Sequence, residues 1–171
     1  MTTHTTSILG VNTVPDTTGR CWFEPYPIAA TNDVWGLLVL RLKDPSAAQA
    51  HGFYGQFTVP QNYVSAPVII PIWTSTATSG NHRMRFTYRT VGGDDTTSLD
   101  QTSNEEQVSL TDAAPGAANR RMAPTGLTLT AGNFAAGETV EFLFERWDDT
   151  GTDTMAADSL IFDLIFQYSD V

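Results

Sequence analysis

The sequence is poor in the residues that usually build disulfides and transition-metal sites. It holds a single cysteine, Cys21, so no disulfide can form within the chain. We expect Cys21 to be a small buried side chain rather than a reactive thiol. The three histidines, His4, His51 and His82, are scattered, and none has a second histidine or cysteine at ligand spacing. We therefore predict no metal site of this kind and no cofactor.

Positive charge is scarce as well. The 171 residues include nine lysines and arginines against 19 acidic residues, which gives a formal net charge of −10. Binding to a phosphate backbone needs clustered cations, and only two small groups are present: Arg83, Arg85 and Arg89, and then Arg120 and Arg121. An anionic membrane is disfavoured for the same reason. We predict that the protein binds neither nucleic acid nor membranes.

Long apolar runs are also missing. No stretch is long enough to span a bilayer. The first residues, MTTHTTSILGVNTVP, lack the charged and apolar regions of a signal peptide. The sequence therefore predicts synthesis and folding in a cytoplasm, which leaves open a later release on a particle by lysis.

Alternating apolar residues, the signature of β-strands, dominate what is present. The strongest case is residues 134–171, which we interpret as two strands joined by a long acidic loop. One face of the second strand is predicted to carry Leu160, Phe162, Leu164, Phe166 and Tyr168. The other face is predicted to carry Ile161, Asp163, Ile165 and Gln167, so the strand is apolar on both sides. Such a strand lies centrally in a sheet or at a subunit contact.

The whole chain repeats this pattern between Gly, Pro, Asn and Asp turns, with almost no helix. About eight strands are predicted: residues 34–43, 53–59, 66–76, 82–91, 105–111 and 121–130, and the terminal pair. This number of antiparallel strands in one domain favours two packed sheets. We predict an all-β antiparallel sandwich of jelly-roll type, with an immunoglobulin-like sandwich as the second choice. The sandwich is expected to span residues 34–171, after an extended N-terminal arm of residues 1–33.

The predicted arm supports two interpretations with equal weight. It is either an anchor ordered by a neighbouring subunit or a docking surface, or a frayed terminus. Within it, residues 21–30 place aromatics beside two prolines. Trp22, Phe23 and Tyr26 either cover the end of the core or form a contact patch. We favour the core, because large apolar residues are normally buried.

No catalytic constellation can be identified. The serines are not in a G-x-S-x-G setting, and no glycine-rich loop joins a strand to a helix. Two acidic loops remain, which hold Asp94, Asp95 and Asp100, and Asp148, Asp149, Asp153 and Asp158. Calcium would suit such oxygen ligands, but the spacing is not that of an EF-hand, and solvated turn acids are the commoner case. Glycosidase carboxylates line a cleft, and these are predicted to lie in flexible loops. We expect no catalytic residues.

The arginines at 83, 85 and 89 are the more informative charges. In the predicted strand they share one face, while Met84, Phe86 and Tyr88 share the other. In an acidic protein they could pair with carboxylates of another subunit. Charges on a solvated sheet face are the simpler interpretation, and we favour it slightly.

Several segments resemble a group of tailed-phage virion proteins. They are an F-x-V-P-x-x-Y segment, a W-T-S-T strand, a Y-R-x-V-G-G-D-D turn and a G-E-T-V-E-F…R…A-D terminal pair. The matching positions are Phe57, Val59, Pro60, Tyr63, Trp73, Tyr88, Arg89, Gly92, Gly93, Gly137, Arg146 and Asp158. The similarity covers roughly residues 50–170, and the first 50 residues show none.

Such proteins look like jelly-roll capsid decoration (cement) proteins, or domains of tail and fibre proteins. The resemblance implies a virion structural role on the capsid surface, with the major capsid protein as partner and a homotrimeric assembly. For a protein with this role, we place the subunit or capsid contacts at Trp22, Phe23 and Tyr26, at Arg83, Arg85 and Arg89, and at Ile161 and Ile165. The alternative is a receptor- or carbohydrate-binding β-sandwich module of a tail or fibre. For that alternative we expect stacking aromatics in loops, whereas Trp35, Trp73 and Trp147 fall mainly in predicted strands.

Overall fold

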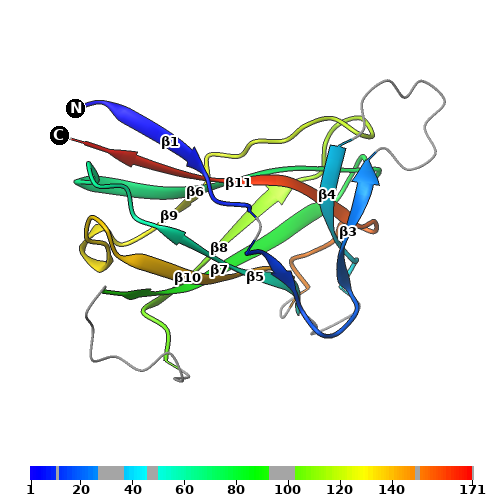
Figure 1. Cartoon of the computed structure of the whole chain (residues 1–171). Coiled ribbons are helices and arrows are strands. Elements are labelled where there is room, and N and C mark those ends of the chain that lie inside the picture. The colour runs from blue at the N-terminus through cyan, green and yellow to red at the C-terminus, as the bar shows by residue number, and fades with distance from the viewer. Residues whose placement is uncertain (11, 27–36, 46–49, 93–102, 149–150, 171) are drawn as a thin grey trace.

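The computed structural model describes residues 1–10, 12–26, 37–45, 50–92, 103–148 and 151–170. Two antiparallel β-sheets pack face to face as the layers of a sandwich (Figure 1). The described residues contain one short 3-10 helix, η1 (Ala131–Asn133), and no α-helix. None of their helices is long and apolar enough to cross a membrane.

One sheet, called sheet A, has the strand order β3-β4-β11-β6-β9, with β1 also paired to β11. Its strands are β1 (Thr3–Ser7), β3 (Cys21–Tyr26), β4 (Leu37–Leu42), β6 (Ser65–Ser75), β9 (Leu127–Thr128) and β11 (Ser159–Ser169). The other, sheet B, has the order β2-β5-β10-β7-β8. Its strands are β2 (Val14–Pro15), β5 (Ala50–Thr58), β7 (Asn81–Val91), β8 (Glu106–Ala113) and β10 (Thr139–Trp147).

The chain crosses between the layers at almost every connection. From β4 to β7 it alternates A, B, A, B, and from β8 to β11 it alternates B, A, B, A. Strands that are neighbours in a sheet are therefore distant in sequence, as in a jelly roll. The predicted all-β jelly-roll sandwich is confirmed, and seven of the eight predicted strands are present; of the predicted strand 121–130, only the two residues of β9 form a strand.

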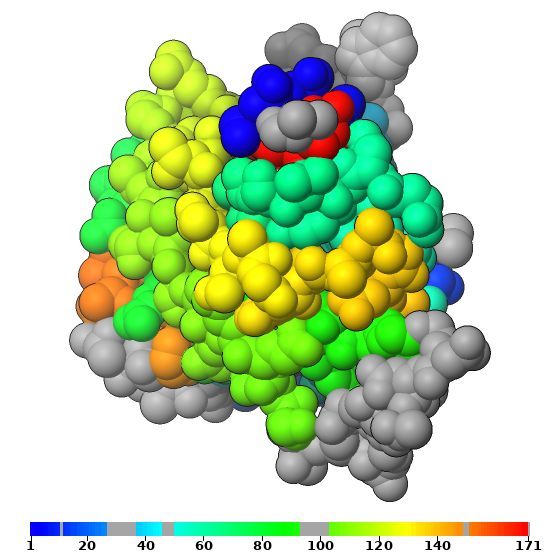
Figure 2. Space-filling view, turned by 90° about the vertical axis from the view of Figure 1, so that its left-hand side faces the viewer, coloured from blue at the N-terminus to red at the C-terminus, as the bar shows by residue number. Residues whose placement is uncertain are grey.

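The core fills the space between the sheets and is rich in aromatic rings. Phe53, Phe86, Phe144 and Phe166 are fully buried between the layers. At the end of the sandwich where both termini lie, Phe134 contacts Tyr63, Tyr88 and Phe166, with ring centroids 5.0–5.9 Å apart. Figure 2 looks at this end, where the first residues (blue) lie against the last (red).

Cys21 lies in this core, as expected. Its side chain is 3% exposed, and burial, with a smaller contribution from Asp16, raises the pKa of the thiol to about 12. The thiol is therefore protonated at neutral pH, which makes it unreactive.

The N-terminal segment is part of the sandwich, in contrast to the predicted arm of residues 1–33. β1 pairs antiparallel with β11, β2 pairs with β5, and β3 pairs with β4. Asp170 fixes β1 further, because it accepts hydrogen bonds from the Thr2 amide and His4 Nε2. The described part of this segment thus forms strands whose pairing partners lie within the same chain. Residues 27–33 lie outside the described residues.

A β-bulge changes the predicted faces of β11. The register against β6 shifts between Ile161 and Asp163, so the inward positions are Ile161 before the bulge and Leu164, Phe166 and Tyr168 after it. Ile161 is fully buried in the core, while Ile165 is partly exposed on the outer side. The prediction that these two residues share a face is wrong, because a bulge inverts the alternation.

Candidate ligand groove on the outer face of sheet B

The outer face of sheet B carries its side chains in rows that run across the strands. One row joins Val14, Tyr54, Leu143, Thr87 and Gln107, which are successive register partners on β2, β5, β10, β7 and β8. Two further rows flank it, one holding Gln56, Glu141 and Arg89 and the other Glu145 and Arg85. The aromatic and aliphatic part of the first row, from Val14 to Leu143, is thus bordered by polar rows on both sides.

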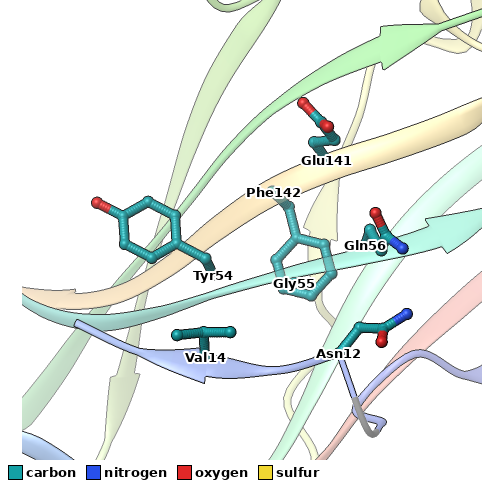
Figure 3. A pocket seen from close by; sticks show the side chains of 7 residues that line it. All are labelled: Asn12, Val14, Tyr54, Gly55, Gln56, Glu141 and Phe142. Atoms are coloured by element: carbon teal, nitrogen blue, oxygen red, sulfur yellow. The ribbon is translucent and has the colours of Figure 1, made fainter. Parts of the chain in front are cut away.

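Two adjacent hollows form a groove over these rows. One, of about 500 Å³, is lined by Asn12, Val14, Tyr54, Gly55, Gln56, Glu141 and Phe142 (Figure 3). The other, of about 220 Å³, extends past Tyr54 toward Thr87, Arg89, Ser103 and Asn104. Because both hollows are lined by Tyr54 and Glu141, they form one groove that crosses the sheet. We call it the sheet B groove.

Two ion pairs supply fixed polar groups beside the groove. Arg89 Nε donates to Glu141 Oε2 at 2.6 Å, and Arg85 Nε donates to Glu145 Oε2 at 2.8 Å. The pKa of Glu145 is raised, because the effect of burial outweighs that of the adjacent positive charge of Arg85, which lowers it. Among the described residues, neither Glu141 nor Glu145 receives a hydrogen bond at Oε1. Glu141, which lines both hollows, therefore keeps an acceptor for a ligand hydroxyl.

Tyr54 is the aromatic ring that is available to a ligand on this face. Its side chain is 53% exposed and lines both hollows. Trp147 lies farther along β10, but Arg85 Cζ is 3.8 Å and Arg83 Cζ 4.8 Å from its ring centroid. These cation–π contacts occupy the indole and leave less of its ring for a ligand.

The structure brings together the three arginines of β7 on the outer face of sheet B. Arg85 and Arg89 pair with Glu145 and Glu141 of the same chain, and Arg83 Nη1 donates to Thr152 Oγ1. Their contacts lie within the chain, so the predicted pairing with carboxylates of another subunit is not needed to explain them.

The aromatic residues of β3 are placed differently from the favoured expectation. Trp22 and Phe23 are 36% and 41% exposed and do not cover the core. Tyr26 is partly buried and contacts the Phe162 ring edge to face. β3 is an edge strand of sheet A, and Trp22 and Phe23 point to opposite faces of it. Ile161 and Ile165, also predicted at a contact, lie on opposite faces of β11.

The second acidic loop is organised by a buried arginine. Arg146, fully buried, donates to both carboxylate oxygens of Asp153 and to the carbonyls of Met155 and Ala157. Asp158 pairs with Arg41. No group of three potential metal ligands occurs among the described residues. Asp94, Asp95, Asp100 and Asp149 lie outside the described residues.

The groove residues were not singled out from the sequence, although a signal existed. In the predicted strand 53–59, alternation puts Phe53, Gly55, Phe57 and Val59 on one face and leaves Tyr54 and Gln56 on the opposite face. We expected stacking aromatics in loops, but Tyr54 is exposed from the middle of a strand. Of the tryptophans considered, Trp73 is buried and Trp35 lies outside the described residues.

Comparisons with known proteins bear on the fold. No family model and no curated protein sequence matches the chain. Among solved structures, the CBM22-1 xylan-binding domain of Paenibacillus barcinonensis Xyn10C is 15% identical, with a TM-score of 0.50 over 94% of this chain and 87% of that one. The family 11 carbohydrate-binding module of Clostridium thermocellum is 4% identical, with a TM-score of 0.48 over 96% and 94%. The chain is thus similar in fold to β-sandwich carbohydrate-binding modules.

Proposed function

We propose that this chain is a non-catalytic carbohydrate-binding module that holds a glycan in the sheet B groove. The observation that carries the proposal is the position of Tyr54, half-exposed at the junction of the two hollows and bordered by Gln56 and the Glu141–Arg89 pair. A sugar presents apolar C–H faces and a rim of hydroxyls. An aromatic ring with fixed polar groups beside it complements both.

The groove is open along its length, which suits a chain better than a single sugar. It crosses from β2 to β7, so a glycan would lie across the strands and contact several of them. Rigid strands position the polar side chains before binding, which reduces the entropy lost on association. The fold is shared with a domain that binds xylan, which supports the same class of ligand.

A glycan microarray tests the proposal directly. We expect the purified protein to bind at least one family of oligosaccharides, and the Tyr54→Ala variant to lose that signal. Binding of the wild type to no glycan, with the folded state verified by circular dichroism, would contradict the proposal.

A second candidate is the capsid decoration protein suggested by the sequence resemblance. The observation that favours it is an apolar patch on the paired strands β3 and β4, where Phe23 and Leu38 share one face and are 41% and 64% exposed. Contiguous exposed apolar residues often mark protein contacts. In this proposal the patch contacts the major capsid protein or another copy in a homotrimer.

The two candidate functions predict different effects of a substitution in this apolar patch. A decoration protein with the Leu38→Asp substitution should lose assembly in light scattering or co-sedimentation with capsids, while glycan binding is unaffected. A monomer at high concentration that does not co-sediment with capsids would exclude this second candidate.

A further inference from the structure

A separate pocket lies on the outer face of sheet A, on the opposite side of the sandwich from the sheet B groove. It has a volume of about 370 Å³ and is lined by Tyr26, Leu37, Ile72, Asn119, Arg121 and Phe162. Ile72 of β6 and Phe162 of β11 come from adjacent strands at the centre of the sheet. Tyr26 and Leu37 are register partners on the β3–β4 hairpin and form one side. We call it the sheet A pocket.

The bulge in β11 shapes the apolar part of this pocket. It places the partly exposed Phe162 in edge-to-face contact with Tyr26, with ring centroids 5.2 Å apart. Bulges in sheets often re-aim a side chain next to a functional site. The result is two aromatic edges and the half-exposed Leu37, which together suit a flat apolar group.

The other side of the pocket is polar and positively charged. Residues 119–122 run along β6, fixed by hydrogen bonds from the Asn119 amide to the Ser75 carbonyl and between Met122 and Trp73. Asn119 lies in a turn with φ 65°, and both Asn119 and Arg121 line the pocket. Among the described residues, the Arg121 guanidinium makes no ion pair or hydrogen bond.

We propose that the sheet A pocket binds a small ligand that joins a flat apolar ring to a carboxylate. The ring packs against Phe162, Tyr26 and Leu37, and the carboxylate accepts hydrogen bonds from Arg121. The volume is within the range of small-molecule sites, roughly 300–1,000 Å³. An unpaired arginine in a chain of net charge −10 favours an anionic partner at this point. This site is independent of glycan binding on sheet B.

Titrations followed by ¹H–¹⁵N NMR test this pocket, with 2-naphthoate and the neutral 2-naphthalenemethanol as probes. We expect 2-naphthoate to shift the amide signals of Leu37 and Phe162 and to bind more tightly than the neutral compound. The Arg121→Gln substitution should weaken 2-naphthoate roughly tenfold, since a hydrogen bond to a charged group is lost. It should leave 2-naphthalenemethanol unchanged.

The matched control is Arg120→Gln, which removes the same charge from the neighbouring residue that does not line the pocket. It should weaken 2-naphthoate by about twofold or less, because a solvated charge is screened. Equal effects of the two arginine substitutions would overturn the proposal. So would equal affinity for both probes, the absence of shifts at the pocket, or shifts centred on Tyr54.

Discussion

Replacing Arg146 with leucine is expected to lower the free energy of unfolding by about 3–5 kcal/mol. The side chain is fully buried and forms hydrogen bonds to Asp153, Asp44, Met155 and Ala157. The side chain of Asp153 is itself 1% exposed, so removal of the guanidinium leaves a buried carboxylate without its charge partner. The cost is that of an uncompensated buried charge, which is larger than the net contribution of the intact pair.

Urea denaturation of single and double variants measures this effect. The double variant Arg146→Leu/Asp153→Leu should be more stable than Arg146→Leu, since both charges are then absent. Arg89→Gln is the matched control: its pair with Glu141 lies at the surface and should contribute about 1 kcal/mol or less. A loss below about 1 kcal/mol for Arg146→Leu would show that the network is not the main support of this loop.

Acidification below about pH 6.5 is expected to destabilise the protein through His82. This residue is fully buried, its ring lies 4.5 Å from that of Trp73, and neither ring nitrogen has a hydrogen-bond partner among the described residues. Burial, and secondly the positive charge of Arg146, lower the pKa of His82 well below 6.5. Below that pH the unfolded chain binds a proton that the folded chain does not, so stability falls by about 1.4 kcal/mol per pH unit.

The readout is the slope of unfolding free energy against pH between about pH 7 and pH 5. His82→Phe should remove roughly 2 kcal/mol of the decline over this range, because no proton is then taken up at this position. The raised pKa of Glu145 makes the free energy of unfolding rise as the pH falls, which opposes the effect of His82. This contribution is the same in the wild type and in His82→Phe, so it cancels in the difference between their slopes. Should His82→Phe fold poorly, His82→Leu gives the same slope test. Equal slopes for wild type and variant would contradict the assignment.

The sandwich itself could be predicted from the sequence because its strands have strong period-two patterns. In β7, Met84, Phe86 and Tyr88 face the core, and the arginines between them face outward. The short strands β1 and β2 could not be found in this way. They are threonine-rich or only two residues long, and their pairing with β11 and β5 comes from tertiary contacts.

Two features of the sites were hidden for different physical reasons. The bulge at Phe162 leaves no mark in the alternation of a strand that is apolar on both faces, so the burial of Ile161 was missed. Arg146 continues the inward series of Val140, Phe142 and Phe144, but no burial was predicted for it. The general rule that arginine is exposed opposed that placement, although a buried carboxylate overrides it here.

The central claim is that Tyr54 holds a glycan in the sheet B groove. Isothermal titration of the best oligosaccharide from the microarray, with wild type, Tyr54→Ala and Trp147→Ala, tests it most directly. We predict that Tyr54→Ala weakens binding at least about tenfold, because an exposed central aromatic ring carries much of the contact energy. Trp147→Ala, whose ring is already covered by Arg85 and Arg83, should change affinity by about twofold or less. Unchanged affinity in Tyr54→Ala, or a greater loss in Trp147→Ala, would contradict the account.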